Sequence, residues 1–316
     1  MNRNQFVKSL ASAIVATQFK PGFHEAKLTA VPSDSYPIRF FSKPLDSYDF
    51  DFMCEILAEC GIGGLDLTVR PGGKIEPEKA DTVLPALSDK ARKYGLSFDM
   101  MVTGFLTPQD PFIQNVLKTA SSAGVKSYRL GWFDYDTSAG IKDTIKKYRQ
   151  ALIGIAELNR KFNIRADYQN HIGLRVGGPV WDLYDLLADL PSEYIGIQYD
   201  VRHAMVEGAS TWPLGLRLNA GRVRSLAIKD FIWQAVDGKP QAVTVPLGEV
   251  MVNWDLYFRT VKELNIKGPV TLHIEYPLLD KEQEKLPLLR KKEIIAEKIR
   301  KDVVFLKNYL NKYQLI

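Results

Sequence analysis

Ionisable and amide side chains recur where short apolar runs of this sequence end. Tyr-Gln-Asn-His at 168–171 ends one run, and Asp-Val-Arg-His at 200–203 follows another. Lys229 and Asp230 follow a third run, and Glu275 ends the last one. Carboxylates that share a cavity can hold a divalent cation or move a proton next to a carbonyl group. These residues predict such chemistry on a polar small molecule, if the fold brings them together.

Short runs rich in β-branched and aromatic residues alternate with helical stretches from residue 36 onward, at a spacing of about 30 residues. The predicted strands are 38–41, 64–68, 96–102, 126–130, 164–169, 195–199, 224–228 and 270–274. The last helix carries one apolar stripe, formed by Ile295, Ile299, Val303, Leu306 and Leu310. This order predicts an α/β fold, a single (β/α)8 TIM barrel with a long C-terminal helix. A doubly wound open sheet is the alternative.

Side-chain alternation favours the barrel over the open sheet. Thr271 and His273 are polar positions in a run whose other positions are apolar. In strand 96–102, Phe98, Met100 and Val102 take the apolar parity. Successive side chains of a strand point to opposite faces, whereas a sheet covered by helices on both sides is apolar on both faces. We therefore expect the apolar parity to face the helices and the polar parity to line a barrel axis.

Active sites of such barrels lie at the C-terminal ends of the strands. The residues expected there are Arg70, Thr103, Gln169, Asp200, Lys229 and Glu275, with Trp132, Asp134, His171 and His203 just beyond the strand ends. Asp200 and Glu275 can face one cavity and hold a divalent cation. The alternative is a set of ion pairs, of Asp200 with Arg202 or Lys229 and of Glu275 with Arg70.

Four motifs in order resemble the sugar phosphate isomerase/epimerase family with its xylose-isomerase-like barrel. YQNH at 168–171 resembles the family's Glu-Asn-His segment after strand five, and QYDVRHAMVEG at 198–208 resembles its Asp-x-x-His segment after strand six. LAIKDF at 226–231 resembles its His-x-Lys-Asp segment, and HIEYP at 273–277 resembles the end of its strand eight, with its glutamate. The resemblance covers residues 36–278.

The resemblance implies a divalent metal, Mn, Mg, Co or Zn, held by Glu, Asp, His and Glu from strands five to eight. This sequence has Gln169 where the first Glu is expected and Ala227 where the His is expected, while Asp200 and Glu275 remain. Three hypotheses stay open. The site binds a metal weakly through Gln169, Asp200 and Glu275, it performs acid–base chemistry without a metal, or it is a degenerate sugar-binding barrel.

The family resemblance implies a sugar isomerase or epimerase that acts on a free or phosphorylated keto-sugar through an enediolate. We expect Glu275 as the base, His203 or His171 as the proton shuttle, and Lys229 as the group that stabilises the oxyanion. The residues expected to bind substrate are Arg70, Trp132, Asp134, Asn170 and Asp230. A dehydratase or lyase on a related keto-sugar, and a non-catalytic carbohydrate-binding barrel, are the alternatives.

The charge distribution favours a small carbohydrate as partner over a nucleic acid. The chain has 42 Lys and Arg against 37 Asp and Glu, and the whole excess of +5 lies in residues 281–316. The balanced remainder lacks the clustered cations that nucleic-acid grooves need. The basic C-terminal helix is a candidate interface for a homo-oligomer. Cys54 and Cys60 are too far apart on a predicted helix for a disulfide, so two free thiols are expected.

The first 30 residues have a cationic start and then a short apolar stretch rich in alanine. This layout predicts an export signal, and hence a periplasmic or exported protein, or else a disordered N-terminus on a cytoplasmic one. Residues 31–316 are expected to form the barrel. No apolar run reaches the length of a membrane span.

Overall fold

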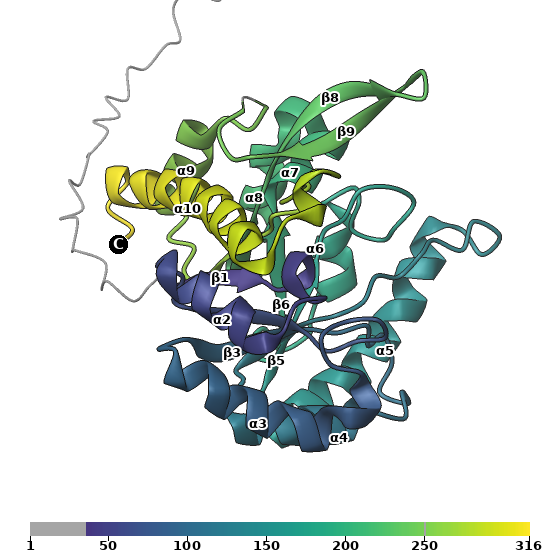
Figure 1. Ribbon diagram of the computed structural model, residues 1–316. Helices are drawn as coiled ribbons and strands as arrows, with labels where there is room; N and C mark the ends of the chain where they lie inside the picture. Colours follow the sequence, from purple (N-terminus) through teal and green to yellow (C-terminus); the bar gives the residue numbers. More distant parts are fainter. Residues whose placement is uncertain (1–35, 250) are drawn as a thin grey trace, which may run out of the picture. The chain divides into compact units, whose positions relative to one another are not determined.

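The structure, a computed structural model, describes residues 36–249 and 251–316, and the predicted export signal lies outside them. Within these residues, eight parallel strands close into a barrel in the order β1-β10-β7-β6-β5-β4-β3-β2, with helices outside (Figure 1). The strands are β1 (Ile38–Phe41), β2 (Gly64–Thr68), β3 (Ser97–Val102), β4 (Ser127–Arg129), β5 (Arg165–Gln169), β6 (Ile195–Asp200), β7 (Val223–Ile228) and β10 (Val270–Leu272). The predicted (β/α)8 barrel is confirmed.

Amphipathic helices cover the barrel and bury their apolar stripes against the strands. They are α2 (Phe50–Glu59), α3 (Ala80–Lys93), α4 (Ile113–Ala123), α5 (Ile141–Phe162), α6 (Asp182–Leu187), α7 (Val201–Gly208), α8 (Trp212–Asn219), α9 (Trp254–Glu263) and α10 (Leu288–Lys312). The predicted stripe of the long helix α10 is buried along its length, from Ile295 to Leu310. Left-handed residues end two helices, Gly124 after α4 and Asn163 after α5.

Polar side chains fill the barrel axis, as the alternation predicts. Thr271 of β10 donates a hydrogen bond to Asp66 of β2 at 3.0 Å, although β1 lies between these strands. Ser225 of β7 reaches Asp167 of β5 at 3.1 Å, past β6. Gly196 of β6 leaves room for the second pair, since a Cβ there would lie 2.6 Å from the Asp167 carboxylate. Contacts between strands that are not neighbours require that these side chains point inward.

Strand β3 departs from the expected parity because it carries a β-bulge. The pairing of β2 with β3 shifts register after Leu65, so Asp66 lies opposite Met100 and Asp99 is skipped. Met100 therefore pairs with Ser127 of β4 and Val102 pairs with Arg129, so both side chains face the barrel axis as those of these two β4 residues do. The prediction that they face the helices is wrong, since one extra residue reverses the parity of everything after it.

A β-hairpin interrupts the alternation of barrel strands and helices after β7. It consists of β8 (Asp230–Val236) and β9 (Lys239–Val245), and Figure 1 shows it extending outward from the barrel. Asp237 and Gly238 form its turn, both with positive φ, at 50° and 73°. Asp-Gly favours this two-residue turn, but the alternation read from the sequence did not anticipate the hairpin.

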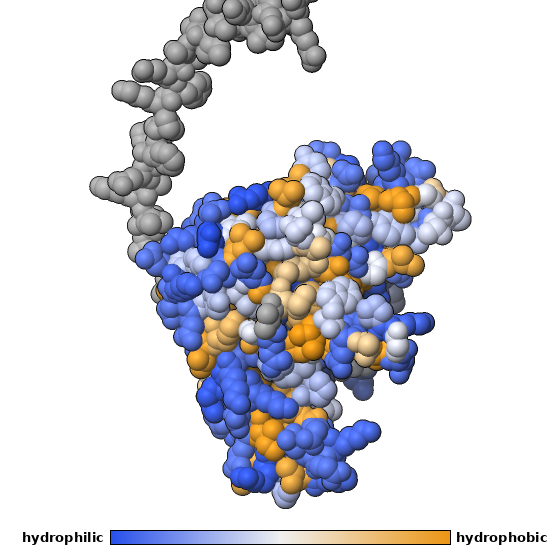
Figure 2. All heavy atoms as spheres, turned by 90° about the horizontal axis from the view of Figure 1, so that it is seen from above, coloured by the Kyte–Doolittle hydropathy of each residue, from blue (hydrophilic) through white to orange (hydrophobic). Residues whose placement is uncertain are grey.

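The basic residues of α10 are partly paired with acids of neighbouring helices. Lys292 lies 2.6 Å from Glu59 of α2, and Lys312 pairs with Asp255 of α9. On the face drawn in Figure 2, hydrophilic residues cover most of the rim and apolar ones lie in small groups. Cys54 and Cys60 are buried free thiols, as predicted. No helix in the part of the chain that the structure describes is long and apolar enough to cross a membrane.

Candidate active site

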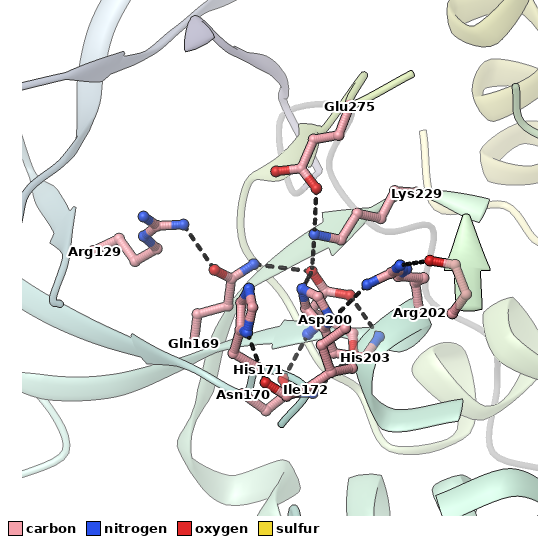
Figure 3. Close-up of polar contacts among 11 residues, drawn as sticks. Arg129, Gln169, Asn170, His171, Ile172, Asp200, Arg202, His203, Lys229 and Glu275 are labelled. Carbon is pink, nitrogen blue, oxygen red and sulfur yellow. Dashed lines mark hydrogen bonds and ion pairs between the residues drawn. The ribbon is translucent and has the colours of Figure 1, made fainter. Parts of the chain in front are cut away.

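Four strands bring a buried group of charged and amide side chains to the barrel axis (Figure 3). Asp200 ends β6 and caps α7, where its Oδ1 accepts the backbone N–H of His203 at 2.9 Å. Its Oδ2 lies 3.1 Å from Nζ of Lys229, which follows β7. The same Nζ lies 2.9 Å from Oε2 of Glu275, which follows β10. One ammonium thus lies between two carboxylates.

Burial and charge act in opposite directions on this triad. The Lys229 and Asp200 side chains are 2% and 0% exposed, whereas Glu275 is 26% exposed. Burial raises the pKa of Asp200, and the charge of Lys229 offsets this only in part. Burial also tends to raise the pKa of Glu275, but the charges of Lys229 and His273 and the Lys229 hydrogen bond outweigh it and lower that pKa to about 2. Glu275 is therefore an anion at neutral pH.

Gln169, at the end of β5, presents an amide N–H to the triad and not an oxygen. Its Oε1 accepts a hydrogen bond from Nη1 of Arg129 at 2.8 Å, and its Nε2 donates to Oδ2 of Asp200 at 2.9 Å. A guanidinium only donates and a carboxylate only accepts, so this orientation of the amide is the one that satisfies both neighbours. Asp200 thus accepts hydrogen bonds from three donors, the backbone N–H of His203, Gln169 and Lys229, and its side chain is 0% exposed, so it is less available as a base than Glu275.

Two histidines lie together beside the triad, with ring centroids 4.1 Å apart. Nη1 of Arg202 lies 3.0 Å from Nδ1 of His203, so Nδ1 accepts and Nε2 carries the hydrogen, 3.6 Å from Asp200. Nδ1 of His171 donates to the carbonyl of Ile172, which leaves Nε2 of His171 as a free acceptor. Burial lowers the pKa of His171 to about 4 and the pKa of His203 well below its usual value. Both rings are neutral at neutral pH.

Comparison with known proteins places this barrel in a family. Residues 54–301 match the family model described as xylose isomerase-like TIM barrel. The chain belongs to this family. The resemblance inferred from the four motifs is thereby confirmed. No curated protein matches the chain.

Solved structures share this xylose isomerase-like barrel at low sequence identity. An L-ribulose 3-epimerase aligns with a TM-score of 0.67 and 13% identity, over 89% of this chain and 96% of that chain. The probable 3-DHS dehydratase AsbF from Bacillus anthracis has a TM-score of 0.60 and 12% identity, over 86% and 98%. The IOLI protein, solved with a zinc atom, has a TM-score of 0.67 and 14% identity, over 88% and 99%. At these identities the likeness establishes the fold alone.

The residues of this site do not fit a divalent metal. Gln169 turns its N–H toward Asp200, and Ala227 offers no ligand. The Lys229 ammonium lies within hydrogen-bonding distance of both carboxylates that would bind a metal. Within residues 36–249 and 251–316, no group of three or more His, Cys, Asp or Glu side chains is placed to hold a metal ion. Two of the expected metal ligands, Asp200 and Glu275, thus both contact Lys229, and the third, Gln169, contacts Asp200.

Asn170 and Asp230, expected to bind substrate, hold the backbone instead. Asn170 donates to the carbonyl of Asp200 and accepts its backbone N–H, at 2.9 and 2.8 Å. The Asp230 carboxylate accepts the backbone N–H groups of Phe231, Gly248 and Val252 and the indole N–H of Trp254. Both side chains are fully buried and satisfied. They position the strand ends and the segment before α9 and leave no atom for a sugar.

The remaining expected substrate residues divide between the mouth of the barrel and its outside. Trp132 lies against the His171 ring, with centroids 4.4 Å apart. Arg70 lies over the ring of Phe41, 5.8 Å from its centroid, on the axis side of β1. The side chain of Asp134 is 79% exposed and is 3.9 Å from Arg175. Arg70 and Trp132 thus lie at the mouth, whereas Asp134 is largely exposed to solvent beside Arg175.

Two arginines at the mouth, Arg129 and Arg175, were not among the expected site residues. Arg129 ends β4, is 4% exposed, and lies 4.3 Å from the Trp132 ring centroid. It shares the polar parity of Ser127, so the alternation used for the other strands would have found it. Arg175 lies 4.8 Å from the same ring, from the segment that follows β5. No local pattern in that segment marks Arg175.

A cavity of about 620 Å³ opens beside Glu275. It is lined by the short helix η1 (Lys43–Leu45), the segment after β10, and Glu284 and Lys291 near the start of α10. The cavity therefore gives a sugar-sized molecule access to the one member of the triad that is partly exposed.

Proposed function

We propose that this chain is a sugar isomerase or epimerase that removes a proton next to the carbonyl group of a keto-sugar, with the Lys229 ammonium as the electrophile. The observation that supports this proposal is the position of Nζ of Lys229 on the barrel axis, 3.1 Å from Asp200 and 2.9 Å from Glu275. Enolisation places negative charge on the carbonyl oxygen, and a preorganised cation beside that oxygen stabilises the transition state. Membership of the xylose isomerase-like family supports the sugar substrate.

Glu275 is the base in this proposal. It is the most exposed member of the triad and borders the cavity. Without substrate, Lys229 and His273 hold the pKa of Glu275 at about 2, and a carboxylate with so low a pKa is a weak base. A substrate oxygen that takes over the Lys229 hydrogen bond frees Oε2 of Glu275 and lets its pKa rise. Asp200 remains as the buried counterion of Lys229, so the cation stays in place.

The two histidines complete the proton transfers. The proton from the substrate carbon goes to Glu275, while Nε2–H of His203 donates a hydrogen bond to the enediolate oxygen. Nε2 of His171 accepts the proton of the neighbouring hydroxyl and passes it to that enediolate oxygen, so the hydroxyl oxygen becomes the new carbonyl oxygen. Return of the carbon-bound proton from Glu275 to the former carbonyl carbon yields an isomer, whereas protonation of the original carbon from the opposite face yields an epimer. The second route needs a proton donor across the sugar from Glu275. His203, whose Nε2 carries a hydrogen, lies with His171 on the β5 and β6 side and is the donor in this proposal.

Solvent deuterium exchange tests this proposal directly. The protein is incubated with a panel of keto-sugars in D₂O, and incorporation of deuterium next to the carbonyl is followed by NMR. We expect exchange with the wild-type protein, its loss in Glu275→Gln, and normal exchange in Glu282→Gln, which changes an 81% exposed glutamate. A product that has lost water would show a dehydratase instead. Sugar binding without exchange would show a non-catalytic barrel.

A further inference from the structure

Three arginines gather on the β2, β4 and β5 side of the mouth over two aromatic rings. The guanidinium of Arg129 lies 5.6 Å from the Phe41 centroid and 4.3 Å from the Trp132 centroid. Arg70 shares the ring of Phe41 at 5.8 Å, and Arg175 shares the ring of Trp132 at 4.8 Å. We call Arg70, Arg129 and Arg175 the arginine cluster. Aromatic faces attract guanidinium groups but do not neutralise their charge.

The buried donors of this cluster lack acceptors. Arg129 is 4% exposed and uses Nη1 on Gln169, whereas its Nε and Nη2 are buried without a hydrogen-bond partner in the described part of the chain. The indole N–H of Trp132 is buried without a partner in the same way. Buried polar groups without partners are costly and uncommon in folded proteins. All three unpaired groups are donors, so the missing partner is a group of acceptor oxygens.

Nearby acids neutralise the arginine cluster only in part. Asp200 and Glu275 share the single ammonium of Lys229, and they act on Arg129 from a distance, as the buried Asp66 does. Within the described residues, none of these three carboxylates forms an ion pair or hydrogen bond with the cluster, and Asp66 accepts a hydrogen bond from Thr271 instead. The carboxylate of Asp134 stands 3.9 Å from Arg175 and is 79% exposed, so it is a weak partner. Burial lowers the pKa of Arg129 to about 10, and the positive charge of Arg70 acts in the same direction. Like charges are thus held together at the mouth, and a bound anion would relieve their repulsion.

We propose that the substrate carries an anionic group, a carboxylate or a phosphate, which Arg129, Arg70 and Arg175 bind. Gln169 lies between this cluster and the triad, since it joins Arg129 to Asp200 (Figure 3). A sugar with its carbonyl on Lys229 can therefore reach the cluster with the far end of its carbon chain. Guanidinium groups recognise carboxylates and phosphates through paired N–H donors, and Nε with Nη2 of Arg129 is such a pair. The inference rests on the proposed function, because it names the substrate class of the same site.

Equilibrium binding to matched sugars tests the inference without relying on turnover. For each configuration in a panel, titration calorimetry compares a ketohexose, the ketohexuronate with the same skeleton, and the ketohexose 6-phosphate. We expect an anionic ligand to bind at least about tenfold more tightly than its neutral counterpart, as charge-assisted hydrogen bonds allow. The better of the two anions tells a carboxylate from a phosphate.

Arginine variants show whether the cluster causes this preference. Arg70→Ala and Arg175→Ala change partly exposed side chains, so these variants are expected to fold even if an Arg129 variant does not. Each should weaken anion binding about tenfold or more and leave the neutral sugar within about twofold. Arg217→Ala, which removes an exposed ion pair, is the matched control and should change neither.

Equal binding of neutral and anionic sugars, equal losses for both in the arginine variants, or no anionic sugar bound at millimolar concentration would overturn the inference. The outcome is separable from that of the proposed function. A preference for anionic sugars without deuterium exchange refutes the proposed enolisation and supports anion binding by the arginine cluster. Deuterium exchange without a preference for anionic sugars supports the enolisation and refutes anion binding by the cluster.

Discussion

Replacement of Lys229 by methionine is the sharpest test of the site, because it removes one charge from a buried triad and nearly keeps the side-chain volume. The lowering of the Glu275 pKa from 4.5 to about 2 corresponds to about 3 kcal/mol, which the partial exposure of this side chain reduces to about 2 kcal/mol. The Asp200 carboxylate, fully buried, is left without its counterion. Loss of one partner of a buried pair costs about 3–5 kcal/mol. These two effects overlap, so we expect the free energy of unfolding of Lys229→Met to be about 3 kcal/mol lower than that of wild type near pH 8.

The pH dependence of this loss has a definite sign. The lowered pKa of Glu275 contributes stability above pH 4.5 that is lost as the pH falls toward about 2, and the variant lacks the part of this contribution that comes from Lys229. The pKa of Asp200 is already raised, and without Lys229 it rises further, so the native variant binds a proton that the unfolded chain does not bind. Stability of the variant therefore falls as the pH rises, and we expect its deficit to shrink to about 1 kcal/mol near pH 5.

Urea unfolding at several pH values measures this deficit, and deuterium exchange measures the catalytic loss. Removal of a preorganised oxyanion partner costs about 10²–10³ in rate, so the Lys229→Met rate should fall by at least that factor. Lys285→Met, which breaks an exposed ion pair, is the control and should lie within about 0.5 kcal/mol of wild type. A Lys229→Met deficit that is small, or that grows toward low pH, would refute the assigned charges. An unchanged exchange rate would refute the electrophile.

Three further predictions concern the metal and the support of the site. Treatment with a chelator should leave the deuterium-exchange rate within about twofold, and a loss that added Mn²⁺ restores would show that a metal is required. Gln169→Glu should place a carboxylate against Asp200, destabilise the protein by about 2 kcal/mol near pH 8 and less near pH 5, and gain a thermal stabilisation by Mn²⁺ that wild type lacks. Equal Mn²⁺ stabilisation of both proteins would contradict our interpretation of the amide. Asp230→Asn puts an amide N–H against bound N–H donors, so urea unfolding should show a loss of about 2–4 kcal/mol, and a loss below about 0.5 kcal/mol would be inconsistent with the anchoring role.

The barrel could be read from the sequence because its signals are local. Alternation within each run depends on residues two positions apart, and the helix ends depend on a residue such as Gly124, so neighbours along the chain suffice to find eight strands. The Asp237-Gly238 turn was equally local and was available as a hairpin signal. The candidate residues at the strand ends followed from the same parity, including Lys229.

The charge partnerships were decided only by the tertiary structure. The sequence left open a metal between Asp200 and Glu275 or ion pairs, of Asp200 with Arg202 or Lys229 and of Glu275 with Arg70. In the structure Lys229 pairs with both carboxylates, so Glu275 pairs with Lys229 and not with Arg70. This depends on the direction of a side chain from a third strand, 46 residues before Glu275. The bulge in β3 likewise depends on how β2 and β3 pair and not on either strand alone. Arg175 joins Arg129 over one indole ring although they come from different strands' ends. Coulomb energies follow distance in space, and distances between strand ends exist only once the barrel has closed.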